Sequence, residues 1–525
     1  MTRLKKYVSN GALMTAVALI LRGLGVAWSA NISQRIGAEA LGLYTLLGSV
    51  YGFALTLALS GINLTATRLV SDALGEGDGA KLRVSMKKCI CYSLFFGILS
   101  AVLLAVFAEP LSLRALGDAR CILPLRLSAV TLPLIALSSC FNGYFTAVRR
   151  VYKNAVVQIS EQLMKIFFCT SLLSLAFARD VESACICLVL GGALAEMISF
   201  AITVTFYAFE KNRHGAQAAS PIPERAVTKK MLSIALPLAA STYFRSALLT
   251  LEHILIPIGI EKSGSNRAAS LAAYGTFQSM AMPLVLFPSA IIHSYSGLLV
   301  PELAQLKIRG EYREIRYVAE RVCRLAIVFA VGVSGILIYF SDALGEGLYR
   351  SAEAGKYIRV VAHIVPIMYL DTTVDNMLKG LGEHLYTMAI NITDTMCSLV
   401  MVWILIPRMG IWGYVALIII SEIFNSGASI YKLKRVTGMR MPLFRWFCVP
   451  VISIVVCTNV GGALLTSAGA PTALSIVLCA AAYPGILLLL GNITREECRW
   501  VGKIFTRARK NSHPAESAEN GVINS

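Results

Sequence analysis

Three arginines lie within or at the edge of long apolar stretches of the chain. Arg22 stands well inside the first stretch, Arg68 lies near the end of the second, and Arg245 lies midway along the seventh. A guanidinium suits phosphate because its planar fork donates two parallel hydrogen bonds. Snorkelling towards water or an internal salt bridge is the alternative for each. We therefore expect these arginines to line a cavity and bind an anion, with both alternatives left open.

Acidic side chains are also embedded in the apolar stretches, and some have a basic neighbour. Glu161 and Lys165 are four residues apart, as are Asp371 and Asp375, and Asp375 and Lys379. Residues at this spacing share one face of a helix. An ion pair along the helix is the simplest interpretation of these acids.

Four further acids lack such a neighbour. They are Glu196, Glu252, Asp394 and Glu422. An intramembrane acid normally faces a cavity or a partner on another helix. Pairing between helices is one interpretation, and binding of a coupling proton or sodium ion is the other.

The sequence offers no set of residues for covalent chemistry. It has no glycine-rich phosphate loop that ends in Lys-Ser/Thr, and its six histidines form no Ser/His/Asp pattern. The 13 cysteines show no metal-ligand spacing and no disulfide framework. We expect no enzyme, cofactor or metal centre. The energy would come from an ion gradient, the membrane potential or the gradient of the cargo.

The elements that must position these residues are membrane-spanning helices. The chain of 525 residues is 56% hydrophobic and 15% charged, with a mean hydropathy of +0.67. About 20 apolar residues cross a bilayer, and such stretches predict an all-α polytopic protein with about 14 transmembrane helices. The net charge of +18 comes from short basic clusters between the stretches, which argues against nucleic acid as a partner.

The basic clusters also predict the orientation. If the N-terminus is cytoplasmic, the inside segments hold about three times as many Lys and Arg as the outside segments. Both termini are therefore predicted to be cytoplasmic. The polar tail, 495–525, has a composition typical of disorder. The second and eighth stretches, 42–70 and 274–300, look longer than one crossing.

The two halves of the sequence resemble each other at a near-constant offset. Pro133 matches Pro366, and Glu161 matches Asp394, with the same offset in both pairs. Six spans per half give parallel repeats that enclose a central cavity. The predicted domains are an N-terminal lobe (1–210), a cytoplasmic linker (211–230), a C-terminal lobe (231–435), two extra helices (436–494) and the tail (495–525).

Helix-bending residues accompany the charges. Pro237, Pro283 and Pro288 fall within apolar runs, where proline removes a backbone hydrogen bond. Gly23 and Gly25 predict a bend beside Arg22.

Three sequence segments resemble a known family. They are Arg35–Tyr44 (RIGAEALGLY), Ser60–Ser71 (SGINLTATRLVS), and Phe141–Phe145 (FNGYF) together with Gln158–Gln162 (QISEQ). With them, the chain resembles the oligosaccharidyl-lipid flippases of the multidrug/oligosaccharidyl-lipid/polysaccharide exporter superfamily. The likeness is closest to the stage V sporulation protein B and polysaccharide biosynthesis group, and it runs over roughly residues 5–490.

This resemblance implies a function and a location. It implies two six-helix lobes with two appended helices in a bacterial plasma membrane. The implied cargo is an undecaprenyl-pyrophosphate-linked saccharide, such as a cell-wall or spore-cortex precursor, with Arg22, Arg68 and Arg245 as the cavity cations. A proton- or sodium-coupled multidrug exporter of the same superfamily is the alternative. A non-transporting scaffold is a third interpretation, which the intact repeat disfavours.

Overall fold

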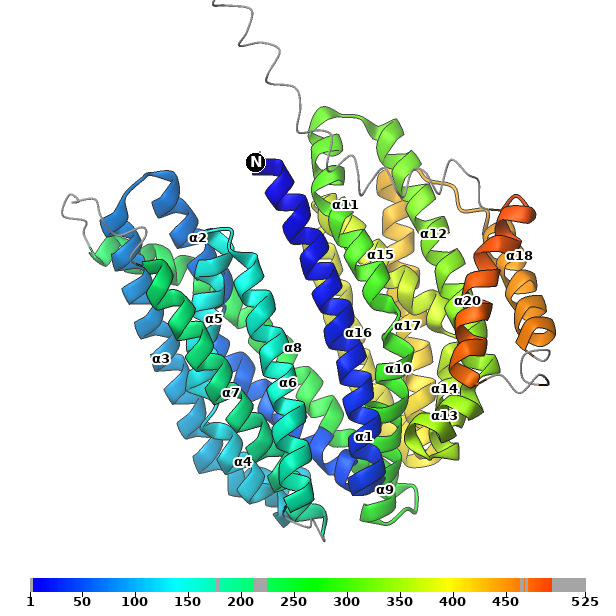
Figure 1. Cartoon of the computed structure of the whole chain (residues 1–525), viewed down its shortest axis with the longest axis horizontal. Coiled ribbons are helices and arrows are strands. Elements are labelled where there is room, and N and C mark those ends of the chain that lie inside the picture. Colours follow the sequence, from blue (N-terminus) through cyan, green and yellow to red (C-terminus); the bar gives the residue numbers. More distant parts are fainter. Residues whose placement is uncertain (1–2, 176–179, 212–223, 463–466, 468–470, 493–525) are drawn as a thin grey trace, which may run out of the picture. The chain divides into compact units, whose positions relative to one another are not determined.

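The computed structural model describes residues 3–175, 180–211, 224–462, 467 and 471–492. These residues form helices joined by short turns, with no β-strand among them, as Figure 1 shows. The predicted all-α fold is confirmed. Most of the predicted linker 211–230, and the predicted tail 495–525, lie outside the described residues.

Helices of the first half of the chain run from the N-terminus to the end of the sixth long apolar stretch. Their bounds are α1 (Arg3–Leu59), α2 (Ile62–Gly75), α3 (Gly79–Pro110), η1 (Leu111–Leu116), η2 (Ala119–Cys121), α4 (Ile122–Ala129), α5 (Leu132–Ala147), α6 (Val151–Leu175) and α7 (Val181–Lys211).

Helices of the second half follow the same order, with two helices added at the end. Their bounds are α8 (Glu224–Lys262), α9 (Arg267–Gly275), η3 (Thr276–Ala281), α10 (Met282–Leu286), α11 (Ser289–Arg309), α12 (Tyr312–Tyr339), α13 (Ser341–Tyr349), α14 (Ala352–Ala362), α15 (Val365–Gly380), α16 (His384–Met409), α17 (Ile411–Thr437), α18 (Leu443–Val456), η4 (Cys457–Gly462) and α20 (Thr472–Leu489).

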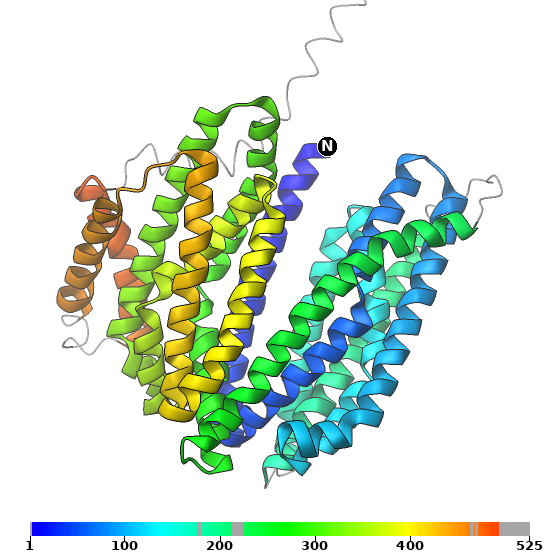
Figure 2. The same ribbon diagram turned by 180° about the vertical axis from the view of Figure 1, so that it is seen from behind.

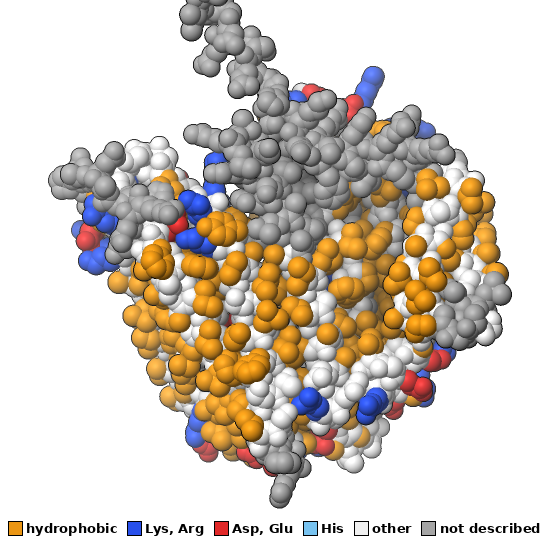
Figure 3. Space-filling model, in the orientation of Figure 1, with side chains coloured by type: hydrophobic (Ala, Val, Ile, Leu, Met, Phe, Trp, Pro, Cys, Tyr) orange, Lys and Arg blue, Asp and Glu red, His pale blue; other side chains and the backbone are white. Residues whose placement is uncertain are grey.

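Many of these helices suit a lipid environment. Among the described residues, nine are long and apolar enough to cross a membrane, or up to eleven if each bent pair is one span. Large apolar side chains point outward along them, such as Phe95 and Val106 on α3 and Trp403 on α16. Figure 3 shows apolar side chains over the visible face of the helices, with charged side chains gathered near helix ends. The count of fourteen stays a prediction.

The overlong stretches contain interruptions. The α1–α2 junction at Ser60 and Gly61 divides 42–70, and the α10–α11 junction at Phe287 and Pro288 divides 274–300. Inside α1 only Gly37 departs from helical backbone angles, with φ 79°. The bend predicted at Gly23 and Gly25 is therefore wrong, because both residues keep a helical backbone.

Helix bounds repeat along the chain. The starts of α5 and α15 are separated by a fixed number of residues along the chain. The ends of these two helices, and the starts of α6 and α16, are separated by the same number. Pro133 and Pro366 lie at the starts of α5 and α15. A backbone N–H in the first turn has no partner within the helix, so proline costs no hydrogen bond there. Three pairs of turns with a positive φ keep this offset: Gly77 and Gly310, Gly117 and Arg350, Arg149 and Gly382.

A close backbone contact joins two residues related by this repeat. Gly42 of α1 packs against the Leu271 carbonyl of α9. Gly275 of α9 packs against the Ala38 carbonyl, whose oxygen lies 2.5 Å from where a Cβ on Gly275 would stand. The repeat offset relates Gly42 to Gly275, and it also relates Ala38 to Leu271. The contact is therefore self-complementary, as contacts on a two-fold axis are.

The chain packs as two compact units. Unit 1 comprises Met1–Arg22, Leu284–Ile390 and Glu422–Ser525, and unit 2 comprises Gly23–Pro283 and Asn391–Ser421. The core of unit 1 lies between α11, α12, α15, α18 and α20. The core of unit 2 lies between α2, α3 and α5, with the first turns of α8. The predicted bounds of the lobes, 1–210 and 231–435, stay a prediction.

Candidate functional site

Arg22 is tied to an interrupted helix in unit 1. Its Nη1 donates to the Leu286 carbonyl at 2.9 Å and to the Ser289 hydroxyl at 2.7 Å. The side chain is partly buried. Arg22 therefore has specific protein partners, while its Nε and Nη2 have no hydrogen-bond partner among the described residues.

Arg68 and Arg245 belong to unit 2, on α2 and α8. Both side chains are exposed, and neither forms a hydrogen bond or ion pair with another described residue. Figure 2 shows α8 running beside the second half of α1. Just after α1 ends, the Ser60 hydroxyl accepts a hydrogen bond from Tyr243 of α8 at 2.7 Å. Two unpartnered guanidinium groups are thus available for a ligand.

The two arginines of unit 2 stand at different levels. Lys230 of α8 pairs with Asp72 at 2.9 Å, one turn beyond Arg68, while Tyr243 lies next to Arg245 in sequence. The rise of a helix, about 1.5 Å per residue, then separates Arg68 from Arg245 by roughly 15–20 Å. They therefore lie at two different depths along α2 and α8 of unit 2.

An acidic cluster occupies the first-half helices of unit 2. Glu196 of α7 is 8% exposed and forms no hydrogen bond or ion pair with a described residue. Glu161 and Lys165 of α6 lie within its electrostatic reach. The expected ion pair of Glu161 with Lys165 is not among the described contacts. Instead, the Lys165 ammonium lies 5.2 Å from the centre of the Trp28 ring.

A second acidic cluster occupies the second-half helices of unit 2. Ser421 of α17 donates to Asp394 of α16, with Oγ to carboxylate distances of 2.7 and 2.9 Å. Glu252 of α8 lies within electrostatic reach of Asp394 and has no hydrogen bond to a described residue. This cluster has no lysine, since the repeat equivalent of Lys165 is Ser398, which is buried.

The remaining predicted acids lie in unit 1 and have partners. Asp375 of α15 accepts a hydrogen bond from Ser429 of α17 at 3.3 Å. Asp371 and Glu422 also have partners in the structure. The partner described for Asp375 is a serine of another helix, so the ion pair along α15 and the role of these acids stay predictions.

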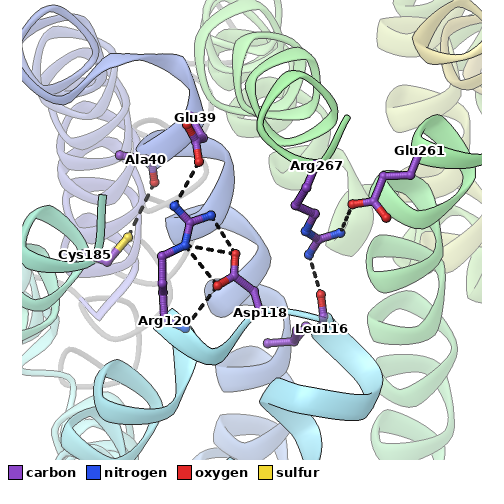
Figure 4. A network of polar contacts seen from close by, with 8 residues as sticks. All are labelled: Glu39, Ala40, Leu116, Asp118, Arg120, Cys185, Glu261 and Arg267. Atoms are coloured by element: carbon purple, nitrogen blue, oxygen red, sulfur yellow. Dashed lines mark hydrogen bonds and ion pairs between the residues drawn. The ribbon is translucent and has the colours of Figure 1, made fainter. Parts of the chain in front are cut away.

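A polar network at one end of unit 2 ties three segments together, as Figure 4 shows. Arg120 pairs with Asp118 at 2.7 Å and with Glu39 of α1 at 2.9 Å. Arg267 pairs with Glu261 at 2.7 Å and donates to the Leu116 carbonyl. Burial raises the pKa of Asp118, but hydrogen bonds from the Arg120 side chain and backbone outweigh it, so this pKa lies below its ordinary value.

Sequence reasoning missed several of these residues. The buried ion pair of Lys153 with Glu210 (2.6 Å) looked like an ordinary charged helix end. Asp118 and Arg120 carry a local signal, an acid two residues before an arginine at a helix start. Ser289 and Tyr369 carry none, because Ser289 accepts from Arg22, 267 residues away in the chain, and Tyr369 donates to the Val285 carbonyl, 84 residues away. The described residues contain no group of three or more His, Cys, Asp or Glu that could hold a metal ion.

Apolar spanning helices, an internal repeat and intramembrane charges define the chain as a polytopic helical transporter. Residues 7–307 match the family model of the polysaccharide biosynthesis protein. The chain belongs to that family.

Two relatives and two solved structures agree with this assignment. Stage V sporulation protein B of Bacillus subtilis (strain 168) is 22% identical over 517 residues, 95% of this chain and 99% of that protein. Lipid II flippase MurJ of the same strain is 22% identical over 469 residues, 82% of this chain and 83% of that protein.

The solved structures are similar in fold. A structure of lipid II flippase MurJ in an inward closed conformation has a TM-score of 0.68 at 11% identity and covers 90% of this chain and 98% of that one. An inward-facing multidrug resistance MATE family transporter of the MOP superfamily has a TM-score of 0.59 at 13% identity and covers 81% and 100%. The chain therefore has the fold of this transporter superfamily.

Proposed function

We propose that the protein moves an undecaprenyl-pyrophosphate-linked saccharide across the bacterial plasma membrane by alternating access. The observation that carries this proposal is the pair of exposed arginines in unit 2, Arg68 and Arg245, which have no partner among the described residues. An unpaired arginine within an apolar span is costly unless it serves a ligand. The relatives named as lipid II flippase and sporulation protein support a lipid-linked cargo.

The levels of these arginines suit stepwise handling of a pyrophosphate. With the N-terminus on the cytoplasmic side, Arg68 would meet the headgroup first and Arg245 would hold it deeper in the membrane. Arg22 of unit 1 is a third candidate cation for the pyrophosphate. The lipid tail would stay in the bilayer while only the polar headgroup passes.

Complementation tests this cargo. A flippase-depleted strain expressing the protein is expected to regain lipid II on its outer membrane face. Arg245→Ala is expected to lose this activity, since a charged hydrogen bond of about 1.5–3 kcal/mol corresponds to roughly tenfold to hundredfold weaker binding. Arg83→Ala is the matched control, because Arg83 is an exposed arginine that only donates to its own helix. Full activity of Arg245→Ala would contradict the assignment.

Coupling to an ion is assigned to the acidic clusters of unit 2. Glu161 and Glu196 share one nearby ammonium, Lys165, so the cluster is neutral when one carboxyl holds a proton. Glu252 and Asp394 have no lysine at the equivalent position, and their carboxylates would bind a sodium ion or a proton. Transport in liposomes under an imposed proton or sodium gradient separates the two ions. Transport that ignores both gradients would contradict coupling at either cluster.

A multidrug exporter of the same superfamily is the second candidate, favoured by the unpartnered acids Glu196 and Glu252. Drug resistance of an overexpressing strain tests it. Resistance without lipid II on the outer face would favour the exporter.

A further inference from the structure

The interruption between α10 and α11 leaves backbone carbonyls without helical partners. Pro288 has no N–H to donate, and the Phe287 N–H reaches only the Leu284 carbonyl at 3.4 Å. A free carbonyl in the hydrocarbon region costs several kcal/mol, so it must find another donor. The partners of this interruption are therefore essential to its shape.

Three side chains supply those partners. Tyr369 of α15 donates to the Val285 carbonyl at 2.7 Å. Arg22 and Ser289 both donate to the Leu286 carbonyl, at 2.9 and 2.7 Å. Arg22 also donates to the Ser289 hydroxyl, which is buried. Arg22, Ser289 and the Leu286 carbonyl are therefore each hydrogen-bonded to the other two.

The position of this set in the chain matters for motion. The chain passes between the two units at four points, and two of them are Arg22/Gly23 and Pro283/Leu284. The bond from Arg22 to Leu286 joins these two crossing points. This bond gives a route by which a change of the backbone at one crossing point is transmitted to the other.

Only half of the Arg22 guanidinium is used. Its Nη1 serves the interruption, while Nε and Nη2 have no hydrogen-bond partner among the described residues. The free edge has the geometry that binds two phosphate oxygens side by side. A single guanidinium can therefore hold the interruption and an anion together.

We propose that Arg22 links pyrophosphate binding to the interruption between α10 and α11, by contacting both. The proposal rests on the proposed function, because it takes the pyrophosphate of the cargo as the anion. An anion on the free edge fixes the guanidinium plane, and this plane sets the bond to the Leu286 carbonyl. Binding and helix shape then depend on each other reciprocally.

Lipid binding to four variants tests the link. The probe is undecaprenyl pyrophosphate, titrated onto the full-length protein in nanodiscs, with its Kd measured by microscale thermophoresis. Arg22→Lys is expected to bind about tenfold more weakly, because an ammonium lacks the fork. Ser289→Ala, which does not touch the lipid, is expected to bind about threefold more weakly, a cost of about 0.6 kcal/mol. The double variant is expected to match Arg22→Lys alone.

The control is Ser334→Ala, which removes another buried serine that donates to a carbonyl (Ala362, 2.7 Å) in unit 1. Wild-type affinity is expected there. Unchanged affinity in Ser289→Ala, or additive losses in the double variant, would overturn the link while leaving the proposed function intact. No binding by the wild-type protein would overturn both.

Hydrogen exchange of the wild-type protein gives a second readout that needs no variant to fold. Added undecaprenyl pyrophosphate is expected to slow amide exchange at residues 284–291. Unchanged exchange there, in a sample that binds the lipid, would overturn the link.

Discussion

Glu161 and Asp394 occupy the same place in the two halves of the chain, but their surroundings differ. Glu161 shares its cluster with Glu196 and with the cation Lys165. Asp394 faces Glu252 and accepts two contacts from Ser421, while Ser398 takes the place of the lysine. The repeat therefore preserves the position of the carboxylate and changes its counter-charge.

The backbone behaves in the opposite way. Several helix bounds, three pairs of positive-φ turns and the contact between Gly42 and Gly275 keep the same repeat offset. The two halves share these backbone features, whereas their charged side chains differ. Substitutions at equivalent backbone positions should have equal effects, and substitutions at equivalent charged positions should not.

Lys165→Met should give the largest difference between the halves. It leaves Glu161 and Glu196 close together without a nearby cation, and a charged group left uncompensated in the protein interior costs about 3 kcal/mol. The melting temperature in nanodiscs measures the loss. Ser398→Ala, at the equivalent position of the second half, should cost much less, because this substitution removes no charge.

A second substitution sharpens this result. Lys165→Met/Glu161→Gln removes the excess negative charge and should recover most of the lost stability. If Lys165→Met melts like the wild-type protein, or if Glu161→Gln brings no recovery, the two clusters do not differ in their counter-charge.

Gly42→Ala and Gly275→Ala should have equal effects. Each methyl group would meet a backbone carbonyl of the facing helix, Leu271 or Ala38. Overpacking at such a contact costs about 1–3 kcal/mol. Melting temperatures of the two variants check the symmetry, with Gly48→Ala as a control where a Cβ meets nothing within 4 Å. A clearly unequal pair would show that the contact is not a repeat of itself.

Asp394→Asn should separate stability from coupling in the second half. The amide oxygen of the asparagine still accepts a hydrogen bond from Ser421, so the loss of stability should be about 1 kcal/mol. Ion binding at the cluster needs the carboxylate, so transport should lose its dependence on the imposed ion gradient. Liposome transport with and without the gradient is the measurement, and Asp375→Asn of unit 1 is the control. A retained gradient dependence would remove Asp394 from coupling.

Sequence alone predicted the helical fold, the repeat and the embedded charges, because apolar periodicity and composition carry these features. It placed the α1 bend at Gly23 and Gly25, whereas only Gly37 departs from helical angles. Gly37 adopts a left-handed backbone that glycine favours, with φ 79°, but a helix also tolerates glycine, so the sequence does not show which glycine marks the turn. Similarly, i,i+4 spacing predicted a pair of Glu161 with Lys165, but the aromatic ring of Trp28 lies under the ammonium instead.

The roles of the arginines were only partly predictable. Position within an apolar stretch identifies Arg22, Arg68 and Arg245 as candidates. It does not tell a tied arginine from a free one, because the partners of Arg22 lie 264 and 267 residues away in the chain. It also does not show that Arg68 and Arg245 stand at separate levels, since that follows from how α8 packs on α1 and α2.

Arg350→Gly should give the smallest effect, and with the opposite sign. Arg350 has a φ of 52°, while its equivalent in the first half, Gly117, has a φ of 67°. A left-handed backbone costs a residue with a Cβ about 1–2 kcal/mol, and glycine removes this cost. The greater freedom of glycine in the unfolded chain cancels about 0.5–1 kcal/mol of that gain. The variant should therefore gain about 0.5–1 kcal/mol and melt at a slightly higher temperature. Gly117→Ala should lose a similar amount. A destabilised Arg350→Gly would mean that the arginine side chain contributes more than its strained backbone costs, and that the two turns are equal in shape only.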